Sequence, residues 1–182
     1  MSGAPDDDDI HALRRGEKAA LDRLMNRWQL PLRAYLYRHV HHEQDALDLA
    51  QETFVRVYRH RDQFRPGARF STWMFQIALN LARDHARRHQ RRPTESLEDV
   101  SEPESGATVH GDLERSETVA AVRSAIAGLP ADLREAVILS EYEDLSHAEI
   151  GMVVGASPKA VETRLYRARD LLRKRLQRWT KR

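Results

Sequence analysis

Residues 145–172, LSHAEIGMVVGASPKAVETRLYRARDLL, have the pattern of two helices joined by a tight turn. Ser146 is followed three residues later by Glu149, which is the spacing of a capping box that begins a helix. Gly155 suits the positive φ with which such a helix ends, and Ser157-Pro158 supplies the N-cap and first position of a second helix. The stretch therefore predicts a helix-turn-helix, the arrangement that places a second helix in the major groove of DNA.

The charges of the chain fall into three blocks, although the net charge is only +2. Residues 1–92 contain 17 Lys and Arg against 12 Asp and Glu, residues 93–118 contain 1 against 8, and residues 119–182 contain 12 against 8. The acidic block is rich in Ser, Pro and Gly, and it lacks the apolar periodicity needed for a folded core. This distribution favours two polyanion-binding modules on a tether, with ordinary solvated surface charge as the alternative.

Both basic blocks show helical periodicity and no alternating strand pattern. We therefore expect an all-α protein of two small helical domains, residues 1–92 and 119–182, joined by a flexible acidic linker, residues 93–118. The second domain contains the helix-turn-helix, and Pro31 is a possible break within the first helices. The chain has no cysteine, which excludes disulfides and thiolate metal sites. It has no membrane span or signal peptide, so a cytoplasmic location is expected.

A helix expected at about residues 43–61 has two different sides when it advances by ~100° per residue. Its predicted core side carries Ala46, Leu47, Ala50, Phe54, Val57 and Tyr58. The opposite side carries Asp45, Asp48, Glu52 and Arg56, with Leu49 among them. From the residues alone, this acidic side is either solvent surface or a docking patch for a basic partner.

The next helix, expected to begin at Ser71 or Thr72, carries a polar stripe of Gln76, Asn80, Arg83 and Arg87. Amide and guanidinium groups can reach base edges and phosphates together. Aromatic residues lie close by in sequence, namely Phe64, Phe70, Trp73 and Phe75. Some of these belong to the core, and an exposed one could stack on an unpaired base.

Three long segments, residues 45–64, 69–92 and 129–176, together resemble regions 2.2, 2.3–2.4 and 4 of extracytoplasmic-function (ECF) sigma factors. The resemblance implies a protein that binds core RNA polymerase, recognises −35 and −10 promoter elements and helps to melt the −10 DNA. It implies no catalytic activity of its own. A helix-turn-helix transcriptional regulator that is not a sigma factor is the alternative, but it leaves residues 45–92 without a role.

The resemblance also assigns sites. Docking on the β′ clamp coiled coil falls to Asp45, Asp48, Leu49, Gln51 and Glu52, while region 4 faces the β flap. Contacts with −10 DNA fall to Phe64, Phe70, Trp73, Gln76, Asn80, Arg83, Asp84, Arg87 and Arg88. Contacts with −35 DNA fall to Ser157, Lys159, Glu162, Thr163, Arg164, Tyr166 and Arg167, whereas Val161 and Leu165 face the core with Ile138 and Ile150. An anti-sigma factor is a further expected partner.

Some positions stay open. Glu162 stands where many relatives have Lys or Arg, and Gly151 replaces the usual alanine at a small loss of helix propensity. Arg164 and Arg169 suit either phosphate contacts or internal salt bridges. We expect no metal, cofactor or enzymatic activity. The cluster of His39, His41, His42, Glu43 and Asp45 lacks a known metal-ligand spacing, and the chain has no Gly-rich phosphate loop or nucleophile motif.

Overall fold

The structure is a computed structural model that describes residues 4–65, 67–91 and 111–177, with side chains described from residue 117 in the last range. The described residues form helices and no strand, as the sequence predicted. The chain divides into two compact units between α4 and α5. The elements are α1 (Ala4–Arg14), α2 (Lys18–Val40), α3 (Glu43–His60), the 3-10 helix η1 (Arg61–Gln63), α4 (Phe70–Arg91), α5 (Gly111–Ala127), α6 (Ala131–Glu141), α7 (His147–Val154) and α8 (Pro158–Arg175).

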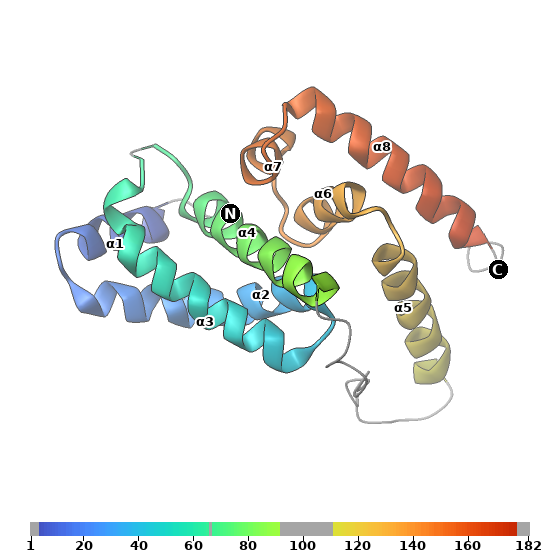
Figure 1. Cartoon of the computed structure of the whole chain (residues 1–182), viewed down its shortest axis with the longest axis horizontal. Helices are drawn as coiled ribbons and strands as arrows, with labels where there is room; N and C mark the ends of the chain where they lie inside the picture. The colour runs from blue at the N-terminus through green and yellow to red at the C-terminus, as the bar shows by residue number, and fades with distance from the viewer. Residues whose placement is uncertain (1–3, 66, 92–110, 178–182) are drawn as a thin grey trace. The chain divides into compact units, whose positions relative to one another are not determined.

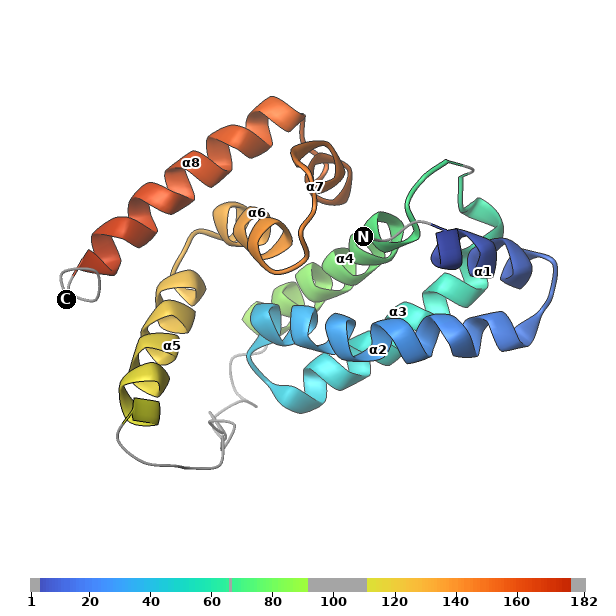
Figure 2. The same ribbon diagram turned by 180° about the vertical axis from the view of Figure 1, so that it is seen from behind.

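In the first unit, α2 packs against α1, α3 and α4. It lies behind α3 and α4 in Figure 1 and in front of them in Figure 2. Most core side chains are aliphatic, and aromatic rings gather where α2 meets α4. There the Tyr35 and Phe75 ring centroids lie 4.8 Å apart, and Trp28 meets Phe75 edge-on at 5.9 Å.

Helix α2 runs through Pro31 without a break, so the predicted break is absent. Pro31 is exposed, while Leu32 behind it is fully buried. A proline within a helix removes one backbone hydrogen bond, and here packing of the flanking turns against three other helices outweighs that loss. The helix ends only at His41, which adopts a left-handed conformation with φ of 56°.

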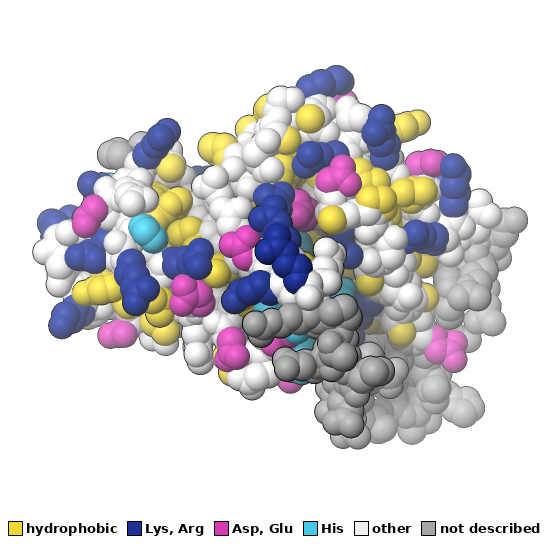
Figure 3. Space-filling view, viewed as in Figure 1, with side chains coloured by type: hydrophobic (Ala, Val, Ile, Leu, Met, Phe, Trp, Pro, Cys, Tyr) yellow, Lys and Arg dark blue, Asp and Glu magenta, His cyan; other side chains and the backbone are white. Residues whose placement is uncertain are grey.

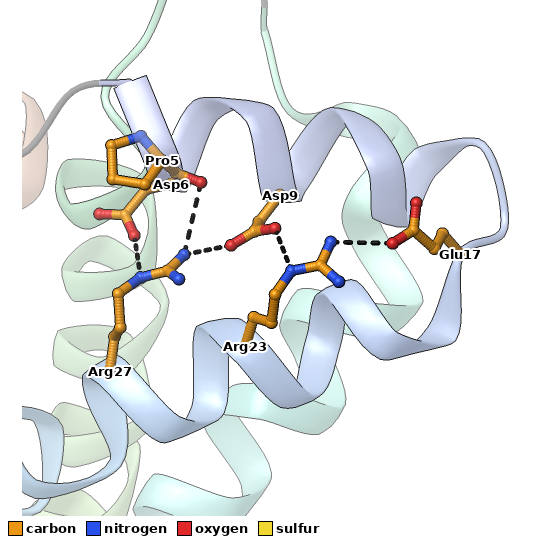
Figure 4. Close-up of polar contacts among 6 residues, drawn as sticks. All are labelled: Pro5, Asp6, Asp9, Glu17, Arg23 and Arg27. Carbon is orange, nitrogen blue, oxygen red and sulfur yellow. Dashed lines mark hydrogen bonds and ion pairs between the residues drawn. The ribbon is translucent and has the colours of Figure 1, made fainter.

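The acidic N-terminal segment is the helix α1, which ion pairs fasten to α2 (Figure 4). Asp9 is buried, and it contacts both the Arg23 Nε at 2.6 Å and the Arg27 guanidinium. Asp6, also buried, accepts from Arg27 Nε at 2.8 Å. Burial alone would raise the pKa of Asp9, but the hydrogen bonds from Arg27 and Arg23 outweigh it and lower that pKa. Asp6 and Asp9 therefore have a structural role.

Helix α5 begins at Gly111, so the last eight residues of the predicted linker, 111–118, are helical. These residues continue directly into the rest of α5, which runs to Ala127. The rest of the predicted linker, residues 93–110, lies outside the described residues.

In the second unit, α6 and α8 pack together, and α5 packs against both. Val161 and Leu165 of α8 are buried, as are Ile138 of α6 and Ile150 of α7, which confirms the predicted core. Arg175 at the end of α8 donates from Nη1 to the carbonyl oxygen of Ala125 at 2.9 Å and so links α8 to α5.

Among the described helices, none combines the length and the apolar character that crossing a lipid bilayer requires.

Candidate nucleic-acid and protein interfaces

The helix-turn-helix has the local structure that its sequence predicts. The Ser146 side chain accepts from the backbone N–H of Glu149 at 3.3 Å, and Glu149 accepts from the backbone N–H of Ser146 at 2.9 Å. Gly155 ends α7 with φ of 74°. Ser157 then caps α8 by accepting from the N–H of Ala160 at 3.2 Å, so its hydroxyl is occupied by the helix.

Gly151 has a steric role that the sequence did not reveal. A Cβ at this position would lie 2.6 Å from the backbone carbonyl oxygen of Ala156, closer than real Cβ atoms come to any neighbour. The turn folds back here because the N–H of Ala156 donates to the Gly151 carbonyl at 2.9 Å. The predicted small loss of helix propensity therefore accompanies a close backbone approach, and a Cβ at this position would require the turn to shift.

The outer face of α8 presents most of the side chains assigned to −35 DNA. Tyr166 is 75% exposed, and Arg167 is also exposed with no ion pair to another described residue. Lys159 and Glu162 pair at 2.8 Å, and hydrogen bonding to Lys159 lowers the pKa of Glu162. The Thr163 hydroxyl donates to the carbonyl of Lys159 at 3.0 Å. Tyr166 and Arg167 are thus the side chains on this face best placed to reach a ligand.

Two arginines whose roles were open form internal pairs. Arg164 is half-buried, and its Nε lies 3.8 Å from Asp132 at the start of α6. Arg169 is exposed, and it pairs with Glu141 at the end of α6 at 2.9 Å. Since both join α8 to α6, they help to fix the angle at which the recognition helix is presented.

Helix α4 carries its polar stripe on the surface, as predicted. Gln76, Asn80 and Arg87 are exposed, and Arg83 is half-buried. Figure 3 shows Lys and Arg side chains over α4 with Asp and Glu side chains beside them. Further along α4, Arg87 pairs with Asp84 at 3.3 Å, and Arg88 donates to the Asp84 carbonyl at 3.4 Å.

The aromatic predictions are corrected at two positions. Phe64 is 2% exposed and Phe70 is 1% exposed, so neither can stack on a base in this conformation. Their rings lie 5.4 and 6.4 Å from Trp73, and Arg14 of α1 donates to the Phe64 carbonyl at 3.4 Å. Buried rings therefore flank the intervening segment at both ends. Helix α4 begins at Phe70, earlier than the expected start at Ser71 or Thr72. Trp73 is half-buried and remains partly accessible.

The expected docking residues of α3 line a shallow groove against α4. Its walls are Asp45, Asp48, Leu49, Glu52 and Arg56 of α3 with Leu81, His85 and Arg88 of α4. Leu49 is 6% exposed, which corrects its expected place on the surface, and Gln51 is exposed outside the groove. Conversely, Leu47 and Tyr58 are exposed instead of buried. The buried side of α3 is rotated because α3 packs on α4 as well as α2.

The carboxylates of this groove differ in their partners. Glu52 pairs with Arg56 at 2.9 Å, and Asp45 lies 3.3 Å from His85 Nε2. Asp48 is exposed and accepts from the neutral amide of Gln44 at 2.9 Å. Of the three, only Glu52 has its charge compensated by an arginine, and Asp48 is the most exposed. His85 was missed at the sequence level because nothing in the chain order brings it next to Asp45.

Comparisons with known proteins agree with this division. The family model for sigma-70 region 2 matches residues 24–92, and the model for sigma-70 region 4 matches residues 120–172. These matches define a protein of the sigma-70 class, built from regions 2 and 4.

Curated relatives identify the type of sigma factor. The RNA polymerase sigma-H factor of Pseudomonas aeruginosa is 34% identical over 183 residues, covering 92% of each chain. The ECF RNA polymerase sigma-E factor of Haemophilus influenzae is 30% identical and covers 92% of this chain and 93% of its own. Among solved structures, CnrH in complex with the cytosolic domain of CnrY has a TM-score of 0.73 and 27% identity, covering 95% and 97% of the two chains.

The chain belongs to the sigma-70 family of RNA polymerase sigma factors, in its ECF type, and it functions in transcription initiation. This family is not an enzyme family.

Proposed function

We propose that the protein directs core RNA polymerase to its promoters by three surfaces, the α3 groove, the polar stripe of α4 and the outer face of α8. The observation that carries the proposal is the combination of an acidic groove with exposed polar and basic helix faces in a chain of this family. The division of labour follows the domains expected from the sequence, region 2 up to residue 92 and region 4 from residue 119. The protein itself contributes no catalysis, and it acts in the cytoplasm, where its polymerase is.

The α3 groove is the docking surface for the β′ clamp coiled coil. Asp48 offers an exposed, uncompensated carboxylate. Glu52 and Asp45 are engaged by Arg56 and His85, so a basic partner must displace or share those contacts. Exposed ion pairs cost little to rearrange. We therefore assign Asp48 the leading role in attracting the coiled coil, with Asp45 and Glu52 supporting it.

The DNA contacts divide between two helices. On α8, Tyr166 and Arg167 face the −35 major groove, and the Lys159–Glu162 pair modulates readout because a carboxylate accepts from a cytosine amine. On α4, Gln76, Asn80, Arg83, Arg87 and Arg88 follow the −10 strand. Trp73 takes over the stacking role that the burial of Phe64 and Phe70 denies to those two rings. Region 4 also contacts the β flap.

An anti-sigma factor is the third partner that we propose. The solved relative CnrH is described in complex with the cytosolic domain of CnrY. A partner of this kind would prevent transcription by covering the same surfaces that bind polymerase and DNA.

The decisive experiment compares two charge reversals of equal size. Asp48→Lys should weaken binding of the full chain to core polymerase by about tenfold, whereas Asp22→Lys, at an exposed position of α2, should leave it unchanged. Equal affinities for the two variants would contradict the docking assignment.

For DNA, Arg167→Ala should weaken transcription from a −35-dependent promoter by about tenfold. The control is Arg123→Ala, on the exposed side of α5. If no protein-dependent transcripts appear although the chain binds core polymerase, the promoter has not been found. If the chain binds promoter-like DNA but not core polymerase, the helix-turn-helix regulator alternative is favoured.

A further inference from the structure

Asp45 of α3 meets two histidines of α4 at one end of the α3–α4 groove. The possible ligand atoms of Asp45, His85 and His89 all lie within 4.8 Å of one another. His85 Nε2 lies 3.3 Å from Asp45 Oδ2, and the His85 and His89 ring centroids are 4.2 Å apart. Three groups that bind metal ions in proteins thus converge from two separate helices.

The two histidines stand four residues apart on α4, which places them on the same face one turn apart. This is the spacing at which a helix presents two imidazoles to one zinc ion. A carboxylate from a neighbouring helix supplies a third ligand, and three protein ligands leave a position for water. Imidazole donors favour zinc and its transition-metal neighbours over magnesium and calcium.

His85 is the more buried of the two histidines, with a side chain that is 17% exposed. Burial lowers the pKa of His85 more than the nearby Asp45 carboxylate raises it, and His89 and Arg88 also act to lower that pKa. Arg88 opposes a second cation, and Asp48 in the same groove offsets it, whereas Glu52 is paired with Arg56.

His42 stands close by but serves another purpose. Its Nδ1 accepts the backbone N–H of Asp45 at 3.2 Å and so caps α3. That atom also lies 3.4 Å from Asp45 Oδ2, but an Nδ1 that accepts from the backbone carries no proton to donate to the carboxylate. His42 therefore fixes the position of Asp45 and leaves the carboxylate to His85 and His89.

We propose that Asp45, His85 and His89 form a binding site for one divalent transition-metal ion of the zinc type. Ligand atoms around tetrahedral zinc lie about 3.3 Å apart, given bonds of about 2.0 Å. The three groups must therefore close by up to about 1.5 Å from their present separation of 4.8 Å or less. His89 is exposed and can supply that movement by side-chain rotation.

The bound ion would cross-link the first turn of α3 to the last turns of α4. It would also engage the carboxylate of Asp45, which contributes to the docking groove. The site thus offers metal availability as a signal to the surface that receives the polymerase, a consequence that rests on the docking assignment, whereas metal binding itself does not.

The test is titration of the full chain, without a histidine tag, with Co²⁺ and then Zn²⁺. Co²⁺ should produce visible absorption bands of a site with nitrogen and oxygen ligands at one ion per chain, and Zn²⁺ should abolish them. His89→Ala should weaken Zn²⁺ binding by more than about tenfold, because loss of an outer-shell partner alone costs about 10–100-fold, and it should not unfold the chain because His89 is exposed. The matched control is His60→Ala, an exposed histidine at the other end of α3.

Two results would overturn the proposal. One is the absence of saturable binding at one ion per chain in the unmodified protein. The other is equal Zn²⁺ affinity in His89→Ala and His60→Ala. Since the assay contains neither polymerase nor DNA, its outcome is independent of the proposed function, and a failed docking experiment would leave a confirmed metal site standing.

Discussion

Replacing Gly151 by alanine sets two physical effects of opposite sign against each other. In a helix interior, alanine is favoured over glycine by about 1 kcal/mol, so propensity alone predicts a more stable α7. The new Cβ, however, would lie 2.6 Å from the carbonyl oxygen of Ala156. That oxygen belongs to the backbone of the turn, so no side-chain rotation can relieve the overlap. Forcing such a contact typically costs about 1–3 kcal/mol.

The overlap should win because the clashing atom is fixed on both sides. Ala156 donates to Gly151 at 2.9 Å, and Ser157 next to it caps α8. We expect Gly151→Ala to destabilise the second unit by up to about 2 kcal/mol net of the propensity gain.

Hydrogen exchange followed by mass spectrometry on the full chain measures this locally. Amides of α7 should exchange about tenfold faster for each 1.4 kcal/mol lost, while those of α2 stay unchanged. Ala148→Gly, at an exposed position of the same helix, calibrates the propensity effect at about 1 kcal/mol. Slower exchange of the α7 amides in Gly151→Ala would refute the steric argument and show that helix propensity dominates.

Three further predictions concern charge and burial. Asp9→Asn should destabilise the first unit by about 1 kcal/mol near neutral pH. Folding lowers the pKa of Asp9, so the stabilisation from this carboxylate is present above its unfolded pKa and is lost as the pH falls through its folded pKa. The variant should therefore lose less stability than the unmodified protein during an acid titration followed by circular dichroism. Phe64→Leu should leave promoter melting intact by permanganate footprinting and cost less than about 1.5 kcal/mol, whereas loss of melting in a folded variant would place this ring on the DNA after all. Glu162→Gln should release Lys159 and steepen the salt dependence of −35 DNA binding by about 0.9 in log–log slope, and an unchanged slope in filter binding would show that Lys159 does not reach phosphate.

The helices and the helix-turn-helix could be predicted from sequence because their signals are local. Ser146, Glu149, Gly155 and Ser157 act through neighbours three or four residues away, and the structure realises each of them. The apolar periodicity of α8 likewise identified its buried side. Such features depend on chain order, which is what a sequence displays directly.

The errors arose where a residue's environment is set by distant elements. Leu49 and Leu47 exchange their expected roles because α3 is packed by two helices, and a helical projection alone cannot show the second one. Phe64 is buried against α1, 50 residues away, through the contact with Arg14. The structural role of Asp6 and Asp9 likewise depends on Arg23 and Arg27 of α2, which the chain order alone does not place opposite them.

The same reasoning ranks the docking carboxylates, which the sequence presents as equivalent. Asp45, Asp48 and Glu52 all lie on one side of α3, but their partners differ. Arg56 already compensates Glu52, and Asp45 is half-buried against His85, so a basic group arriving at Glu52 gains only the difference and one arriving at Asp45 finds a less accessible carboxylate. At Asp48 it replaces a hydrogen bond from a neutral amide, so it gains most of the attraction of a new ion pair. Specificity for a basic partner is therefore concentrated at Asp48, and the engaged neighbours hold the groove in shape around it.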